Sequence, residues 1–119
     1  MLARANLRPR HRNAGRPLDK SAPGFLQWVR GRGCIVAGPG CDGKIEAAHV
    51  DYAGGKGMGT KVADRFAVPM CAHHHRHQHA IGWARFEAAF KVNALHLANQ
   101  FWAAWPGRRA WEQKMEDRP

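Results

Sequence analysis

The stretch Cys71-Ala72-His73-His74-His75-Arg76-His77-Gln78-His79 decides the fold of this chain. It holds five of the eight histidines and one of the three cysteines in the sequence. Successive residues of an α-helix turn by about 100°, so a helix here places His75 and His79 on one face. Cys71 and His74 then share a neighbouring face. The stretch therefore predicts a helix that carries two separate pairs of metal-ligand side chains.

Two further cysteines, Cys34 and Cys41, lie upstream and frame a loop that contains glycine and proline. Together with Cys71 and His74 they form a Cys3His set, which is a regular closed ligand set for zinc. An odd number of cysteines favours thiolate ligands in a reducing cytosol over a disulfide framework. The competing interpretations are two buried free thiols and a surface histidine tract that binds metal incidentally. A cloning tag is disfavoured because the tract is internal and follows the strand-like residues 66–70.

Chain length limits the core. The sequence has 119 residues, enough for one domain, and its first twenty or so show no apolar periodicity. A core of roughly ninety residues is marginal, and a structural zinc would add roughly 10–16 kcal/mol of apparent folding free energy. No apolar run is long enough to cross a membrane, and the N-terminus lacks the apolar segment of a secretory signal. We therefore expect a cytoplasmic protein without a membrane partner.

The charge of the chain is strongly positive, at +10 with a pI of about 10.6. Eight of its lysines and arginines precede Cys34 and are opposed only by Asp19. This balance favours a partner rich in phosphate, although a solvated basic tail explains residues 1–20 equally well. We predict a basic flexible arm over residues 1–20, in which each neutralised phosphate of duplex DNA adds about −0.9 to the salt slope of binding.

The middle of the chain predicts a helix, two strands and the histidine helix. The first helix begins with Ser21 as its N-cap, and glycines end it after residue 30. Strands are expected at 44–52 and at 62–70, on either side of the glycine-rich loop 53–61. Two residues apart on the first strand, His49 and Asp51 point the same way.

The C-terminal part predicts two more helices. The first carries Phe86 and Phe90, and the second begins at Asn93 as its cap. Apolar residues at 86, 90, 97, 101 and 105 have helical spacing and indicate core packing. Pro106-Gly107 ends the second helix, and residues 106–119 are predicted to be a charged C-terminal tail.

This pattern resembles the HNH, or ββα-metal, nuclease superfamily, and more closely its small phage and prophage members. The matching residues are Cys34 with Cys41, Glu46-Ala47-Ala48-His49-Val50, Gly57-Met58-Gly59 with Lys61, Asp64, and the run from Val68 to His79. The resemblance covers residues 21–105. It implies an α+β fold: a small ββα-metal core with a structural zinc, one N-terminal helix and two C-terminal helices. It also implies a phage- or prophage-encoded protein that acts in a bacterial host cell.

The resemblance assigns roles to single residues. His49 takes the position of the general base, and His75 and His79 take those of the ligands of a catalytic divalent ion. The structural zinc positions fall on Cys34, Cys41, Cys71 and His74. Asp64 lies near the central asparagine that names HNH proteins, the residue that usually holds the loop and the base in place.

Two positions depart from the family pattern. Asp64 is an aspartate rather than an asparagine. Ala48 stands before the base, where a metal-binding Asp or His is often found. A third ligand of the catalytic ion is therefore open among Asp51, Glu46 and Asp64. Otherwise water and the substrate phosphate complete the shell, as Mg²⁺ tolerates.

The function implied by this resemblance is a metal-dependent endonuclease that hydrolyses phosphodiester bonds of DNA. A neutral histidine titrates near the right pH to deprotonate the attacking water, and one divalent ion stabilises the phosphate charge. Imidazole ligands bind Mn²⁺, Ni²⁺ or Zn²⁺ more tightly than Mg²⁺, so affinity alone does not decide which ion the cell uses. The candidates for the catalytic ion are Mg²⁺, Mn²⁺ and Ni²⁺. We predict contacts with nucleic acid at Lys56, Lys61 and Arg76.

Two other function classes stay open. A non-catalytic, zinc-stabilised nucleic-acid-binding module is motivated by Ala48 and by the loop between Cys34 and Cys41. This loop is longer than the two residues that usually separate the cysteines of a zinc knuckle. It needs one tight zinc site, whereas a nuclease needs a second, weaker metal site. A zinc hydrolase acting on small molecules is disfavoured, because a small substrate needs no basic arm. The sequence leaves open the choice between DNA and RNA and the oligomeric state.

Overall fold

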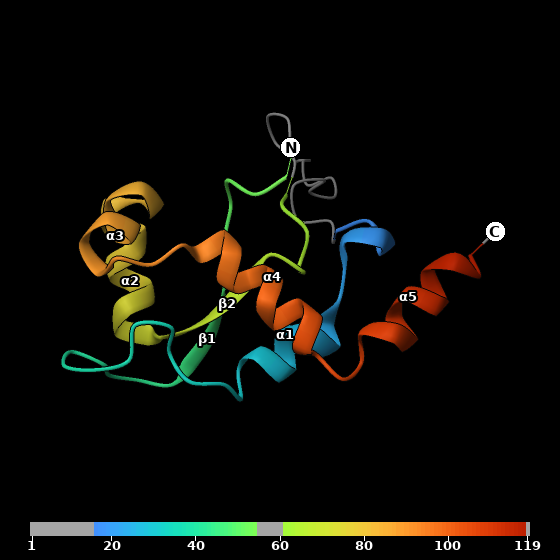
Figure 1. Cartoon of the computed structure of the whole chain (residues 1–119), viewed down its shortest axis with the longest axis horizontal. Coiled ribbons are helices and arrows are strands. Elements are labelled where there is room, and N and C mark those ends of the chain that lie inside the picture. The colour runs from blue at the N-terminus through green and yellow to red at the C-terminus, as the bar shows by residue number, and fades with distance from the viewer. Residues whose placement is uncertain (1–15, 55–60, 119) are drawn as a thin grey trace, which may run out of the picture.

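The computed structural model describes residues 16–54 and 61–118 of the chain. They form an α+β fold of five α-helices and a two-stranded antiparallel sheet (Figure 1). The elements in chain order are the 3₁₀-helix η3 (Leu18–Lys20), α1 (Pro23–Val29), β1 (Ile45–His49), β2 (Ala67–Cys71), α2 (Ala72–Ile81), α3 (Trp83–Phe90), α4 (Ala94–Ala104) and α5 (Arg108–Glu116). None of the helices in these ranges has the length and apolar character that a membrane span requires.

The two strands form a short hairpin that pairs from Ile45 opposite Cys71 to His49 opposite Ala67. Both strands are shorter than the predicted ranges 44–52 and 62–70. Beyond His49, the main chain adds one hydrogen bond, from the Val50 N–H to the Phe66 carbonyl at 2.7 Å, before both segments turn away. β2 is buried along its whole length, which explains its unbroken apolar sequence.

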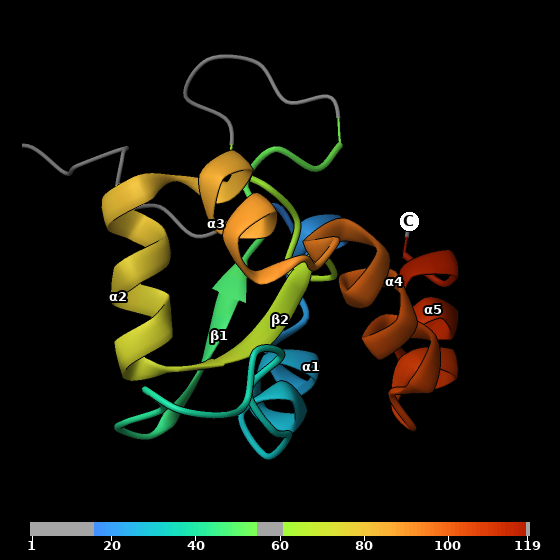
Figure 2. The same ribbon diagram turned by 60° about the vertical axis from the view of Figure 1, so that its left-hand side comes forward.

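The predicted histidine helix is confirmed as α2, which continues directly from β2. Cys71 is both the last residue of β2 and the N-cap of α2, and its Sγ accepts the His74 N–H at 3.4 Å. α2 packs against β1, and the two run side by side in the same direction (Figure 2). β1, β2 and α2 therefore form a strand–strand–helix unit.

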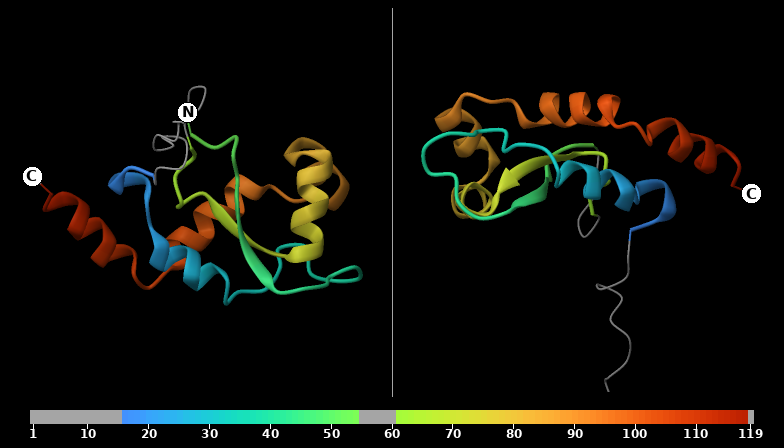
Figure 3. Two further views of the ribbon diagram at one scale, coloured as in Figure 1. Left: turned by 180° about the vertical axis from the view of Figure 1, so that it is seen from behind. Right: turned by 90° about the horizontal axis from the view of Figure 1, so that it is seen from below.

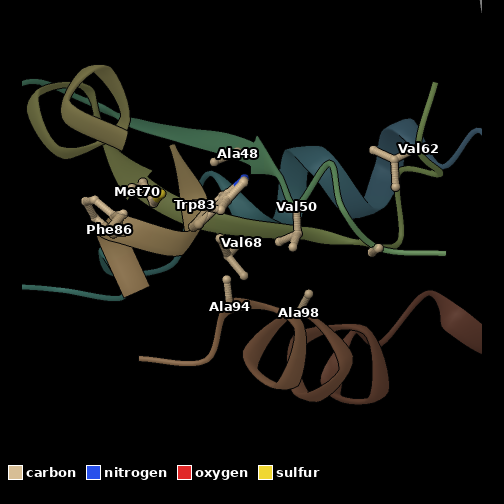
Figure 4. Close-up of a cluster of buried hydrophobic side chains, with 10 residues drawn as sticks. Ala48, Val50, Val62, Val68, Met70, Trp83, Phe86, Ala94 and Ala98 are labelled. Atoms are coloured by element: carbon tan, nitrogen blue, oxygen red, sulfur yellow. The ribbon is translucent and has the colours of Figure 1, made fainter. Parts of the chain in front are cut away.

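The larger hydrophobic cluster lies between the hairpin and the helices α3 and α4 (Figure 4). Its members are Ala48, Val50, Ala53, Val62, Val68, Met70, Trp83, Phe86, Ala94 and Ala98. Ala94 and Ala98 are fully buried because their small side chains let α4 approach the hairpin closely. The predicted stripe of α4 does pack on the core, since Leu97, Phe101 and Trp105 are half-buried against the two hydrophobic clusters. The buried residues of the helix are their neighbours Ala94, Ala98 and Trp102.

The smaller cluster joins α1 to β2 and α4 through Phe25, Val29, Ala67 and Trp102, with Ala22. Ser21 was predicted to cap α1, but the N-cap is Ala22, which has no side-chain cap bond. The Ser21 carbonyl instead accepts the indole N–H of Trp111 at 2.8 Å. Ser21 therefore takes part in a tertiary contact through its main chain and does not cap the helix with its side chain.

The predicted charged tail at 106–119 contains a helix that was not predicted, because Arg108–Glu116 form α5. Trp111 anchors this helix: its ring meets that of Trp102 edge-on at 5.2 Å. Arg108 and Glu112 pair at 3.1 Å across one turn. α4 and α5 follow one another along one side of the molecule (Figure 3). The expectation of two C-terminal helices after α2 was therefore one helix short.

The predicted arm, residues 1–20, lies outside the described residues as far as position 15. Its last part belongs to the fold, since residues 18–20 form η3. Arg16 Nε donates to the Val62 carbonyl at 2.7 Å, and the Lys20 carbonyl accepts the Asp64 N–H at 2.9 Å. The segment 16–20 is thus packed against the chain that leads into β2.

Candidate functional site

Three thiols and one imidazole converge where the loop after α1 meets the start of α2. The ligand atoms of Cys34, Cys41, Cys71 and His74 all lie within 4.8 Å of one another. His74 Nδ1 lies 3.2, 3.5 and 3.7 Å from the sulfurs of Cys71, Cys41 and Cys34. Tetrahedral zinc, with bonds of about 2.3 Å to sulfur and 2.0–2.1 Å to nitrogen, requires S···N edges of roughly 3.6 Å. The four residues are close enough to hold a metal ion, and their geometry is consistent with a structural zinc.

Backbone hydrogen bonds hold the cysteine loop against the hairpin and α2. The Ile35 N–H donates to the Pro69 carbonyl at 3.0 Å, and the Ala72 N–H donates to the Lys44 carbonyl at 2.9 Å. Gly43 has φ +84°, and a Cβ there would lie 2.7 Å from the Ala72 Cβ. Only glycine fits this turn, so the return of the chain into β1 depends on it.

The protonation states of this cluster suit metal binding. Burial, helped by two neighbouring histidines, lowers the pKa of His74, so its imidazole is neutral and Nδ1 can coordinate. Burial raises the pKa of the Cys34 thiol. For Cys71 burial acts in the same sense, but hydrogen bonds from the backbone of His74 and Asp42 and from the other two thiols outweigh it, and its pKa is lowered. The thiolate, the form that binds metals, is therefore favoured at Cys71.

A second group lies at the carboxyl end of β1, where His49 Nε2 is 2.9 Å from Asp64 Oδ1. Asp64 Oδ2 accepts the Ala22 N–H at 2.9 Å, and Arg16 Nε lies 3.4 Å from Oδ1. The Asp64 side chain is only 6% exposed. Burial alone would raise its pKa, but the hydrogen bonds from His49 and Ala22 and the Arg16 charge leave the pKa lowered.

The ionised carboxylate decides which nitrogen of His49 carries the proton. A carboxylate only accepts hydrogen bonds, so Nε2 of His49 must be the donor and Nδ1 keeps its lone pair. Within the described ranges, no hydrogen bond engages His49 Nδ1. The His49 side chain is 25% exposed. An imidazole held in this way can accept a proton at Nδ1.

The third group lies on α2, where the Nε2 atoms of His75 and His79 are 3.2 Å apart. Two imidazoles bound to one ion at about 2.1 Å have their nitrogens about 3.0–3.4 Å apart. Glu46 Oε1 lies 2.7 Å from the other nitrogen of His75, Nδ1. Among the described residues, no third Cys, His, Asp or Glu completes a three-ligand group with this pair.

The comparisons with known proteins place the chain by family. A family model described as "Protein of unknown function (DUF968)" matches residues 15–105. The chain belongs to the DUF968 family. The match begins one residue before Arg16, spans all three groups and ends at Trp105, ahead of α5. No curated protein and no solved structure matches the chain.

The sequence also singled out several residues of this DUF968 chain beside these three groups. Ala48 is fully buried in the larger hydrophobic cluster, and Asp51 is exposed in the turn after β1. Arg76 and Lys61 are exposed, whereas Lys56 lies outside the described residues. Of the three residues considered as a third ligand, Asp64 binds His49, Glu46 binds His75, and Asp51 joins no ligand group.

Sequence reasoning missed the part that Arg16 takes in the DUF968 fold. It assigned this residue to the flexible arm as a phosphate contact, but Arg16 contacts both Val62 and Asp64. These contacts span more than forty residues of sequence, so no local spacing could have indicated them.

Among the other histidines, His77 packs edge-on against Phe86 and Phe90, with ring centroids 5.9 Å apart in both pairs.

Proposed function

We propose that this chain is a metal-dependent endonuclease of the HNH, or ββα-metal, type that hydrolyses phosphodiester bonds of DNA. The observation that carries the proposal is the pair formed by His49 and Asp64. It joins an imidazole with a free Nδ1 to an ionised carboxylate at the end of β1. The strand stands beside a helix that carries a second histidine pair.

The layout of β1 and α2 supports this proposal. Both start from the paired residues Ile45 and Cys71 and run in the same direction (Figure 2). A helix rises about 1.5 Å per residue and a strand about 3.3 Å. His79, eight residues into the helix, therefore stands about 12 Å from the start, close to the level of His49, about 13 Å along the strand. The base and the metal pair come at a similar height on neighbouring elements.

In this mechanism His49 Nδ1 takes a proton from the attacking water. Asp64 holds the ring in the required tautomer and stabilises the imidazolium that forms, because its carboxylate accepts the Nε2–H throughout. Positioned general bases of this kind contribute typically about 10²–10⁴-fold to a rate. A divalent ion bound by His75 and His79 would supply the Lewis acid for the phosphate and the leaving oxygen. Mg²⁺, Mn²⁺ and Ni²⁺ are the candidates, with water and the substrate phosphate as further ligands.

A structural zinc bound by the Cys3His cluster belongs to the same proposal. It would fix the cysteine loop to the start of α2, one turn before His75. The net charge of +10 supports DNA as the partner, with exposed Lys61 and Arg76 as contacts. The resemblance to small phage and prophage nucleases remains the basis for proposing a bacterial cell as its setting.

A second candidate function is a non-catalytic, zinc-stabilised nucleic-acid-binding module. Two observations favour it: Ala48 is part of the core, and among the described residues the pair His75–His79 has no third ligand. The two functions differ in metal stoichiometry. A calorimetric titration of the zinc-loaded protein with Mn²⁺ should show a second, weaker site for a nuclease and none for a binding module.

The direct test is cleavage of supercoiled plasmid by the purified protein in Mg²⁺ or Mn²⁺, with EDTA as the negative control. Metal-dependent nicking that His49→Ala removes is the expected result. DNA binding without cleavage in any metal would favour the binding module instead.

A further inference from the structure

We infer that Glu46 is a positioning residue of the α2 metal pair: its carboxylate turns the His75 ring so that Nε2 faces the ion. This inference rests on the proposed function, because it assumes that His75 and His79 bind a metal. Glu46 would act through His75 rather than as a ligand itself.

The hydrogen-bond geometry separates the two nitrogens of His75. Nδ1 lies 2.7 Å from Glu46 Oε1, and Nε2 lies 3.2 Å from His79 Nε2. An ionised carboxylate only accepts, so Nδ1 carries the proton and the lone pair is on Nε2. That lone pair is directed toward the histidine one turn away. The carboxylate thus selects the tautomer that can coordinate together with His79.

The strand explains why Glu46 can do this. Residues two apart on β1 share a face, so Glu46 lies on the same face as Ala48 and Val50, the face that packs toward α2 and α3. Ala48 is fully buried there and offers no ligand. Glu46 is therefore the acidic residue of β1 that contacts the metal-pair face of α2. Its side chain is 38% exposed, and that of His75 is 19% exposed.

A similar relation exists at His49. There Asp64 accepts from Nε2 and leaves Nδ1 free, whereas here Glu46 accepts from Nδ1 and leaves Nε2 for the ion. A partly exposed carboxylate–histidine pair by itself contributes little to stability. Its effect should therefore show in metal affinity and not in the melting temperature.

Calorimetric Mn²⁺ titrations of the full-length, zinc-loaded protein test the inference. Glu46→Ala should weaken Mn²⁺ binding by about 10–100-fold, the usual effect of losing such a partner, and Glu46→Gln should weaken it less. The zinc content should stay at the wild-type value. Glu116→Gln, which changes an exposed carboxylate on α5, is the matched control and should bind Mn²⁺ like the wild type.

A double-mutant cycle shows whether Glu46 acts through His75. In a His75→Ala background, Glu46→Ala should cause no further loss of Mn²⁺ affinity, because the ring that it positions is gone. Wild-type Mn²⁺ affinity in Glu46→Ala, or losses that simply add in the cycle, would overturn the role of Glu46 and leave the nuclease proposal standing. A wild-type protein that binds no Mn²⁺ beside its zinc would overturn both.

Discussion

His49 and Asp64, fifteen residues apart in sequence, are joined by a hydrogen bond of 2.9 Å between Nε2 and Oδ1. The same carboxylate accepts the Ala22 N–H and lies 3.4 Å from Arg16 Nε. One buried side chain thus ties the end of β1 to the start of α1 and to the segment before η3. Asp64 therefore matters for stability as well as for the proposed catalysis, and its contribution to stability should depend on pH.

Asp64→Asn should lower the free energy of unfolding by about 1–3 kcal/mol at pH 7, because it weakens buried hydrogen bonds to an ionised group. The folded-state pKa of Asp64 lies below its unfolded value, about 3.9, so its ionised form stabilises the fold above that pH. This contribution is lost as pH falls through the folded-state pKa. Urea unfolding at several pH values should show the wild type and the variant converging in acid.

The control for this series is Asp51→Asn, which changes an exposed aspartate after β1 and should leave stability nearly unchanged. A difference between Asp64→Asn and the wild type that is the same at pH 7 and in acid would contradict the ionised-carboxylate account.

Tyr52, the only tyrosine of the chain, should titrate late. Burial and then the Glu87 carboxylate, which accepts its hydroxyl, raise its pKa to about 12. An absorbance titration of tyrosinate should therefore have its midpoint near 12, and Glu87→Gln should shift it toward the ordinary value of about 10. Far-ultraviolet circular dichroism over the same range shows that the protein is still folded. A wild-type midpoint near 10 would contradict the contact.

Cys71→Ser should release the zinc and lower the free energy of unfolding by several kcal/mol, part of the roughly 10–16 kcal/mol that a structural zinc site supplies. Metal analysis and thermal unfolding measure both effects. His73→Ala, an exposed neighbour on the same helix, is the matched control and should keep its zinc. If Cys71→Ser retains wild-type zinc content and melting temperature, the Cys3His assignment is wrong.

Deletion of residues 1–15 should weaken DNA binding and flatten its dependence on salt. The segment contains Arg4, Arg8, Arg10 and Arg12, and each contact with a phosphate of duplex DNA contributes about −0.9 to the slope. The deletion ends before Arg16 because that residue contacts Val62 and Asp64 within the fold. Affinities measured between 50 and 200 mM salt decide the question, because four such contacts would cost about 10² in affinity over that range. An unchanged slope would show that this segment does not contact DNA.

Local patterns in the sequence predicted the parts of this fold that depend on local physics. The histidine spacing predicted α2, and the Asn93 cap of α4 is confirmed, since its side chain accepts the His96 N–H at 2.9 Å. The Cys3His cluster could be predicted because metal ligands are few in type and two of them lie three residues apart on one helix.

Contacts between segments that are distant in sequence could not be predicted from such local patterns. The Asp64 carboxylate accepts a hydrogen bond from the main-chain N–H of Ala22. Almost every residue carries such an N–H, so the sequence does not show which one a distant carboxylate will bind. α5 was missed because its mixed charges hide its anchor, Trp111, whose partners Trp102 and Ser21 lie in other segments. The centre of the buried face of α4 was not predicted because Ala94 and Ala98 are only weakly apolar, yet their small size is what permits close packing.

Plasmid cleavage by the wild type and by His49→Ala, each with Mg²⁺, Mn²⁺ or EDTA, tests the central claim most directly. His96→Ala, an exposed histidine on α4, is the control. The account predicts metal-dependent cleavage by the wild type and by His96→Ala, and none by His49→Ala, which should still fold and bind DNA. Cleavage by a clean preparation of His49→Ala would contradict the assignment of the base. Failure of the wild type to cleave in any metal would contradict the nuclease itself.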